Sequence, residues 1–184
     1  MIPAAILVGG RSTRMGRDKA YLLHDGRPMA LCVADTLLAG GCTHVVLVGS
    51  IPGLDSLGLP VLRDPPGLGT HPLAGVSAAC ALGPLVLTAP CDIPSVQRED
   101  IQALLAPGVP TEAFAGGRRH PLLGVVDGTV APALVAAARS GASARDALSG
   151  RLSVHVSQGA SRNINTPAEL AMLHAGAEGE HGNR

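Results

Sequence analysis

The residues best suited to chemistry stand in a glycine-rich, basic segment near the start of the chain, LVGGRSTRMGRDK (7–19). Glycine lets backbone N–H groups approach an anion closely, and arginine and lysine neutralise phosphate oxygens. We therefore expect this segment to bind a polyphosphate. The spacing matches neither G-x-G-x-x-G nor G-x-x-x-x-G-K-[ST], so the common dinucleotide and P-loop motifs are not supported. The basic residues of the segment are Arg11, Arg14, Arg17 and Lys19.

A carboxylate ends a second apolar run, in the segment TAPCDIP (88–94). Asp92 in this position suits Mg²⁺, which prefers one or two carboxylates together with water and phosphate oxygens. Aspartate also caps helices and turns, and the residue alone leaves both roles open. A basic, glycine-rich loop facing it favours the metal.

Apolar runs and helical patterns alternate along the chain. This order predicts an α/β fold, a three-layer Rossmann-like sandwich with a mostly parallel central sheet. Ligands bind such sheets outside the carboxyl ends of the strands, where the 9–19 loop, Asp64 and Asp92 all fall. We expect strands at 4–8, 44–49, 59–64 and 84–92, a strand and turn at 119–128, and a strand at 151–157. We expect helices within 27–41, 71–82, 98–106, 129–141 and 163–174.

The composition excludes two classes of partner. The chain has 184 residues, only 15% of them charged, and its 14 basic residues balance 14 acidic ones. A neutral chain lacks the electrostatic footprint that nucleic acids or anionic membranes require. With no Trp, one Tyr and one Phe, the chain also cannot stack bases on aromatic side chains. We expect neither nucleic acid nor membrane as a partner.

The length and the cysteines predict the organisation of the chain. We expect a single domain over 1–175 and a disordered tail over 176–184. No basic segment precedes the first apolar run, so we expect a cytoplasmic protein with reduced thiols. The cysteines show no C-x-x-C spacing, which argues against a zinc ribbon. They are Cys32, Cys42, Cys80 and Cys91.

Five segments in order resemble the motifs of one family. They are LVGGRSTRMGRDK, HPLAGV, APCDIP, RHPLLGVV and NINTPAEL, which run from residue 7 to residue 170. Together they resemble the molybdenum cofactor guanylyltransferases of the nucleotidyltransferase-A superfamily. The first and third segments mark the superfamily, and the closing one, with the first, points to the guanylyltransferase branch.

The resemblance implies an activity and its ligands. The family transfers GMP from GTP to molybdopterin, uses Mg²⁺, releases pyrophosphate and makes the guanine dinucleotide form of the cofactor. The implied partners are GTP, molybdopterin with or without molybdenum, and the proteins that carry molybdopterin or assemble molybdoenzymes. The implied catalytic residues are Arg14, Lys19 and Asp92, with Asp92 as the Mg²⁺ ligand.

The resemblance also implies binding roles, position by position. The guanine pocket would be lined by Leu7, Val8 and Gly9, and the triphosphate held by Gly10, Arg14 and Lys19. Asp64 and Asp92 would contact the nucleotide. The molybdopterin side would carry His120, Asn163 and Asn165.

Three positions depart from the family pattern. Val48 stands where the family often has Asn, Val8 replaces Ala, and Thr70–His71 replaces a Gly. The first and third changes bear on base selectivity and nucleotide affinity more than on the fold, and Val8 is a modest enlargement next to the base. A molybdopterin cytidylyltransferase or a sugar-phosphate nucleotidyltransferase of the same fold therefore stays open. So does a silent nucleotide-binding module, although its expected loss of Lys19 or Asp92 is not seen.

The histidines and asparagines have simpler interpretations as well. His71 and His120 each precede a proline, and a single histidine is usually a hydrogen-bonded structural residue. Asn163 and Asn165 alternate, so their side chains share one side of an extended segment. Thr166 already suffices to cap the following helix, so we expect at least one of the two asparagines to face a ligand.

Overall fold

A five-stranded sheet forms the centre of the computed structural model, which describes residues 1–9, 18–164 and 169. The strand order is β5-β4-β1-β6-β9, and only β9 runs antiparallel to its neighbour. The strands are β1 (Ala4–Leu7), β4 (Val45–Val48), β5 (Val61–Leu62), β6 (Leu85–Pro90) and β9 (Gly124–Asp127). The predicted α/β sandwich with a mostly parallel sheet is confirmed.

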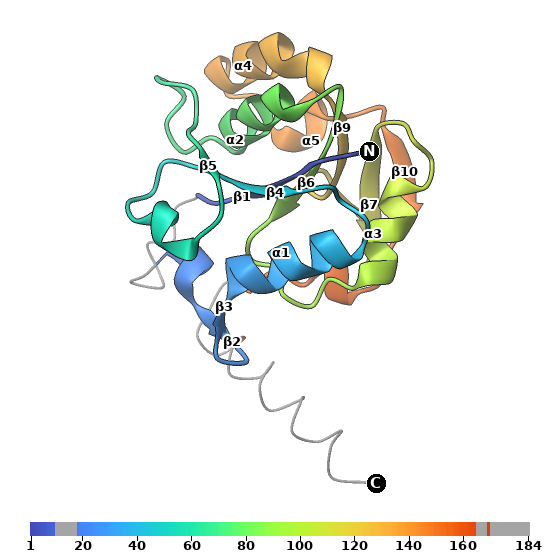
Figure 1. Ribbon diagram of the computed structural model, residues 1–184. Coiled ribbons are helices and arrows are strands. Elements are labelled where there is room, and N and C mark those ends of the chain that lie inside the picture. The colour runs from blue at the N-terminus through green and yellow to red at the C-terminus, as the bar shows by residue number, and fades with distance from the viewer. Residues whose placement is uncertain (10–17, 165–168, 170–184) are drawn as a thin grey trace, which may run out of the picture.

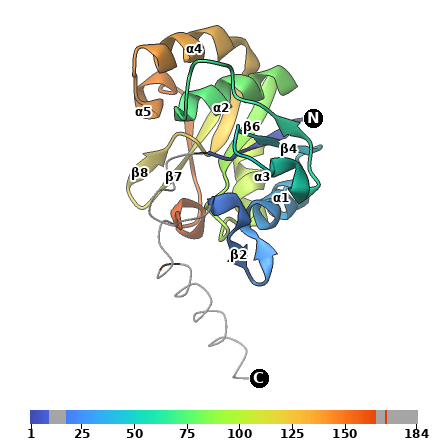
Figure 2. The same ribbon diagram turned by 90° about the vertical axis from the view of Figure 1, so that its left-hand side faces the viewer.

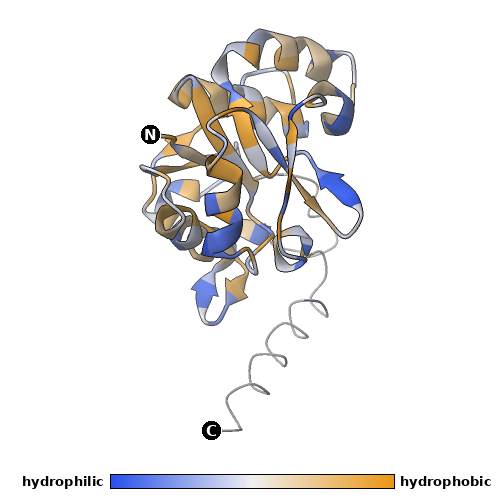
Figure 3. Cartoon of the chain, turned by 90° about the vertical axis from the view of Figure 1, so that its right-hand side faces the viewer, coloured by the Kyte–Doolittle hydropathy of each residue, from blue (hydrophilic) through white to orange (hydrophobic). Residues whose placement is uncertain are grey.

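Helices cover both faces of this sheet, which makes three layers (Figure 1). One face carries α1 (Met29–Ala39) and α3 (Arg98–Leu105), and the other carries α2 (Pro72–Ala79) and α4 (Ala131–Arg139). Because both faces are covered, β4 is buried at every residue, as its unbroken apolar run predicts. Hydrophobic colour accordingly gathers in the strands and the inner helix faces (Figure 3).

Local signals in the sequence set the helix starts. His71 caps α2 through Nδ1, which accepts the Leu73 N–H at 3.2 Å, and Pro72 opens the helix. At α3, Gln97 and Asp100 form a reciprocal capping box. Short 3-10 turns lie at Lys19–Tyr21, Leu54–Leu57, Cys80–Leu82, Gly128–Val130 and Gly159–Ser161.

A second sheet lies beside the first, and the sequence analysis did not predict it as a sheet. Its order is β10-β7-β8, with β10 (Leu152–His155), β7 (Thr111–Ala115) and β8 (Arg118–His120). The strand predicted within 119–128 is in fact split between two sheets, because a turn after His120 separates β8 from β9. A small hairpin, β2 (Leu23–His24) with β3 (Arg27–Pro28), and the short helix α5 (Ala144–Ala147) were also missed.

Buried charge explains why β7 escaped prediction. Glu112 lies in the middle of β7 and is 1% exposed, so the strand lacks a simple apolar pattern. Its carboxylate contacts the guanidinium groups of Arg119 and Arg151 and accepts the Ser153 hydroxyl at 3.1 Å. Paired in this way, a charged residue is tolerated in the interior.

Several predictions concern segments at the end of the chain. The helix predicted within 163–174 and the tail 176–184 lie almost wholly outside the described residues. The single-domain prediction over 1–175 stays a prediction. Among the described residues, none of the helices has the length and apolar character needed to cross a membrane.

Candidate functional site

A cavity of about 350 Å³ opens at the carboxyl ends of the central strands. In Figure 1, β1 runs from the N-terminus at the right toward the left, and Figure 2 turns that side to the viewer. The cavity is lined by residues that end or follow adjacent strands, as the α/β topology predicts. They include Leu7, Val8 and Gly9 after β1, Val48 and Ser50 at β4, Asp64 after β5, and Cys91 and Asp92 after β6.

A close backbone approach at Gly49 lies beside this cavity, between the lining residues Val8, Val48 and Ser50. A Cβ at Gly49 would stand 1.8 Å from the Val8 carbonyl oxygen, so only glycine fits there. The Val8 N–H donates to the carbonyl of Val48, the last residue of β4, at 2.7 Å, which extends the β1–β4 pairing one residue past the end of β1. The backbone of Val8 and Gly9 is thereby held at the cavity edge.

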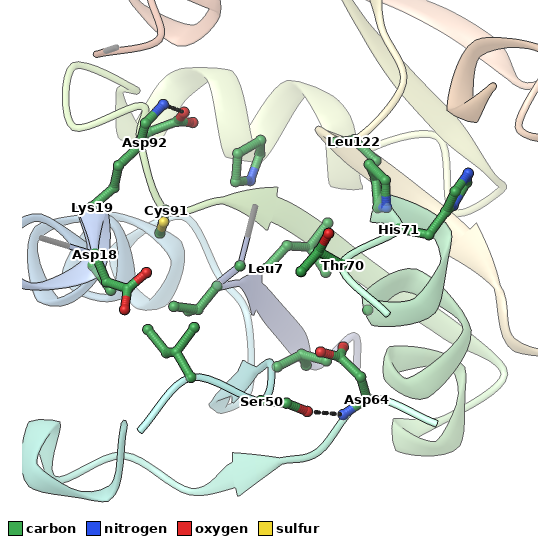
Figure 4. Close-up of a pocket in the computed structure, with 18 of the residues that line it drawn as sticks. Leu7, Asp18, Lys19, Ser50, Asp64, Thr70, His71, Cys91, Asp92 and Leu122 are labelled. Carbon is green, nitrogen blue, oxygen red and sulfur yellow. Dashed lines mark hydrogen bonds and ion pairs between the residues drawn. The ribbon is translucent and has the colours of Figure 1, made fainter. Parts of the chain in front are cut away.

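An ion pair in the cavity wall joins two residues far apart in the sequence. Lys19 Nζ donates to Asp92 Oδ2 at 2.7 Å, and their side chains are 18% and 13% exposed (Figure 4). Asp92 follows β6, and Lys19 begins the 3-10 turn Lys19–Tyr21. The sequence placed both residues at one edge of the sheet, and the structure brings them into contact.

The second oxygen of Asp92 is the feature that suits a metal ion. Asp92 Oδ1 is buried and has no hydrogen-bond partner among the described residues. No cluster of three or more His, Cys, Asp or Glu side chains suited to a metal occurs in that part of the chain. A single carboxylate with one unsatisfied oxygen fits Mg²⁺, which draws its remaining ligands from water and phosphate oxygens.

The opposite wall combines a carboxylate with apolar side chains. Asp64 lines the cavity together with Leu7 and Val48, and burial raises the pKa of its carboxyl group. Cys91 also lines the cavity, and burial raises the pKa of its thiol to about 12. The thiol is therefore protonated and inert at neutral pH, whereas the Asp64 carboxylate offers acceptor oxygens.

The remaining predicted site residues divide into three groups. Asn163 lines the cavity, as expected of at least one of the two asparagines. His120 does not line it; its Nε2 lies 3.3 Å from the Ala115 carbonyl oxygen, and burial lowers its pKa. Outside the described residues lie Gly10, Arg11, Arg14, Arg17 and Asn165.

Sequence reasoning missed several residues that line the cavity. Ser50 and Gly75 are two of them, and Leu122 enters from the segment between β8 and β9. Ser50 could have been found from its place directly after the end of a predicted strand. Leu122 could not, because its approach depends on the second sheet. His71 lines the cavity too, and its capping bond confirms the structural interpretation.

These observations define a class of protein first. A cavity of this size at the carboxyl edge of a mostly parallel sheet, with a lysine and two aspartates in its walls, is typical of Rossmann-like α/β proteins that bind nucleotides. Comparison with known families then gives a narrower result. The family model of the MobA-like NTP transferase domain matches residues 4–156. The chain belongs to this family of MobA-like NTP transferases.

Individual relatives agree with the family. The chain is 33% identical to a molybdenum cofactor guanylyltransferase of Ralstonia nicotianae, over 94% of this chain and 95% of that one. It is 39% identical to the one from Cereibacter sphaeroides, over 71% and 72% of the two chains.

Solved structures support the fold alone. The molybdopterin-guanine dinucleotide biosynthesis protein A from Archaeoglobus fulgidus superposes with a TM-score of 0.78 at 20% identity, over 97% of this chain and 100% of that one. The 2-C-methyl-D-erythritol 4-phosphate cytidylyltransferase from Thermus thermophilus superposes with a TM-score of 0.68 at 18% identity, over 97% and 100%.

Proposed function

We propose that this protein transfers GMP from GTP to molybdopterin and releases pyrophosphate. The observation that carries the proposal is the Lys19–Asp92 pair in a cavity at the carboxyl edge of the sheet. The names of the similar proteins, molybdenum cofactor guanylyltransferases over nearly the whole chain, supply the substrates. A phosphate oxygen of molybdopterin attacks the α-phosphorus of GTP, and the bond to the β-phosphate oxygen breaks.

The attacking oxygen is already anionic, so the reaction needs no strong general base. Catalysis then consists of positioning and charge stabilisation. Lys19 exchanges its bond with Asp92 for the triphosphate oxygens and offsets charge on the departing pyrophosphate. Lysine suits this task because its ammonium is a compact point charge.

Asp92 would hold the magnesium ion through the oxygen that lacks a partner. When bound, the ion would neutralise the phosphate oxygens. The backbone of Leu7, Val8 and Gly9 and the carboxylate of Asp64 would hold the nucleoside, since all four residues line the cavity.

Other assignments rest on the sequence motifs. Gly10 and Arg14 would join Lys19 at the triphosphate, and Asn163 and Asn165 would face molybdopterin. The place of Asn163 in the cavity wall supports that role. His120 would also lie toward molybdopterin, outside this cavity, with its ring beside the Ala115 carbonyl oxygen. All four cysteines are free thiols, which suits a reducing cytoplasm. Carrier proteins would supply molybdopterin there, and molybdoenzyme-assembly proteins would take the product.

The test is pyrophosphate release from GTP in the presence of molybdopterin and Mg²⁺. Lys19→Ala should lower turnover on the order of 10²-fold or more, the scale of losing a charged transition-state contact. Asp92→Asn should raise the Mg²⁺ concentration needed for half-maximal rate. Arg98→Ala is the matched control, because it removes an exposed cation that pairs only with neighbouring Glu99 among the described residues. Near-normal turnover of Lys19→Ala would refute its role.

A further inference from the structure

Asp64 forms a hydrogen bond with Ser50, a residue that the sequence motifs do not assign to the site. Val48 of β4 pairs with Leu62 of β5, and Ser50 and Asp64 each follow two residues later. The parallel register therefore carries both residues to the same point beyond the sheet. There the Asp64 N–H donates to Ser50 Oγ at 3.2 Å (Figure 4).

The Ser50 hydroxyl also has a proton to give. A hydroxyl accepts and donates at once, so the bond from the Asp64 N–H leaves its own proton available. A hydrogen bond from the Ser50 side chain lowers the pKa of Asp64 and partly opposes the larger effect of burial. The backbone bond therefore holds the Ser50 hydroxyl beside Asp64, where it can donate its own proton to the carboxylate and restrict the rotation of that side chain.

The Asp64 carboxylate lies beside an apolar part of the cavity wall, formed by Leu7, Val48 and Gly75 and called the slot below. A Cβ built on Gly75 would lie 3.2 Å from Leu7 Cδ2, 3.6 Å from Asp64 Oδ1 and 3.8 Å from Val48 Cγ1. These three side chains therefore surround Gly75 closely, and any side chain at that position would crowd them. A flat ring entering this slot packs against Leu7 and Val48 and meets the Asp64 oxygens with its edge.

We propose that Ser50 is a positioning residue that sets the base selectivity of this cavity by aiming the Asp64 carboxylate at the base. The inference rests on the proposed function, because it assumes that the slot holds the base of the nucleotide. Guanine is the common base that offers two adjacent N–H donors, N1–H and the 2-amino group. They match the two oxygens of one carboxylate, as a guanidinium does. Adenine, cytosine and uracil place an acceptor beside their donor, which a carboxylate repels.

The experiment compares the affinities for GTP and inosine triphosphate, whose base lacks only the 2-amino group. Titration calorimetry with Mg²⁺ is done on the wild type and on Ser50→Ala, Ser50→Thr and Asp64→Asn. We expect the wild type to prefer GTP by about tenfold or more, the value of one hydrogen bond to a charged group. Asp64→Asn should remove most of this preference, and Ser50→Ala should reduce it severalfold. Ser50→Thr, which keeps the hydroxyl, should restore it.

A purely structural role of Ser50 would affect both nucleotides equally. Ser56→Ala is the control, since it removes another exposed serine hydroxyl, one that does not line the cavity. Two results would overturn the inference about Ser50 without affecting the proposed function. In one, Ser50→Ala keeps the wild-type preference for GTP; in the other, Ser50→Ala weakens the binding of both nucleotides equally. If the wild type binds neither nucleotide, the proposed function falls together with it.

Discussion

Arg151 is the residue whose loss should cost the protein most stability outside the hydrophobic core. Its guanidinium donates to the carbonyls of Leu148, Thr111 and Pro121 at 3.0, 3.0 and 2.6 Å. Its side chain is 7% exposed, and Nη2, which donates to the Pro121 carbonyl, also lies 3.8 Å from Oε2 of Glu112, whose side chain is 2% exposed. Burial lowers the pKa of Arg151 to about 10, so the group remains charged at neutral pH.

We expect Arg151→Met to lower the free energy of unfolding by about 3–5 kcal/mol, the usual cost of breaking a buried charge pair. Methionine fills most of the space but satisfies neither the carbonyls nor Glu112. Each buried acceptor left unpaired costs about 1–3 kcal/mol, and these costs are not additive. Because Arg151 holds the Pro121 carbonyl, the wall formed by Leu122 should also loosen and weaken nucleotide binding.

Urea unfolding followed by circular dichroism measures this loss. With an m-value of about 1–3 kcal/mol per molar, the midpoint should fall by more than about 1 M. The double variant Arg151→Met, Glu112→Gln should not recover the loss, because Glu112 keeps Arg119 and Ser153 as partners in the single variant and its neutralisation leaves Arg119 without its carboxylate. A loss below about 1 kcal/mol, as expected of an exposed ion pair, would show that the cluster is solvated and would refute the reasoning.

Three further predictions follow from single contacts. Gly49→Ala should cost about 3 kcal/mol or more and abolish nucleotide binding, because its Cβ meets the Val8 carbonyl oxygen at 1.8 Å; a normal melting temperature would contradict this. In native protein, Ellman's reagent should modify Cys32 first, because the other cysteines are buried and have pKa values raised to about 11–12; rapid uptake at any of them would be inconsistent. Burial lowers the pKa of His120 below 6.5, so the unfolded state binds more protons, and stability should fall as the pH drops from about 7 to 5. His120→Gln should flatten that part of the pH profile, and an unchanged profile would rule His120 out as its source.

The sequence predicted the central sheet well because its strands are unbroken apolar runs. It also predicted that Asp64 and Asp92 lie at the same edge of the sheet, where both line the cavity, because the carboxyl ends of parallel strands share that edge. The second sheet was missed because β7 carries a buried Glu112, whose partners come from β8 and from the segment before β10. Only tertiary contacts make that charge acceptable in a strand.

The sequence predicted where the site lies in the fold, but not which of its side chains contact one another. Strand order brings Lys19 and Asp92 together, yet nothing in their spacing reveals the 2.7 Å bond between them. The contact of Ser50 with Asp64 depends on the register of β4 with β5, which two short apolar runs do not determine. The assignment of His120 toward molybdopterin stays a prediction, because the residue does not line this cavity and its ring contacts the Ala115 carbonyl oxygen.

The most direct test of the central claim follows the label of α-³²P GTP in a reaction with molybdopterin and Mg²⁺, beside a parallel reaction with α-³²P CTP. We predict that the α-label of GTP enters a molybdopterin dinucleotide and that unlabelled pyrophosphate leaves in equal amount. Both should depend on the acceptor and on Lys19. Transfer from CTP in preference to GTP would contradict guanylyl transfer and point to a cytidylyltransferase. Label that stays in the nucleotide, with acceptor and metal present, would contradict catalysis altogether.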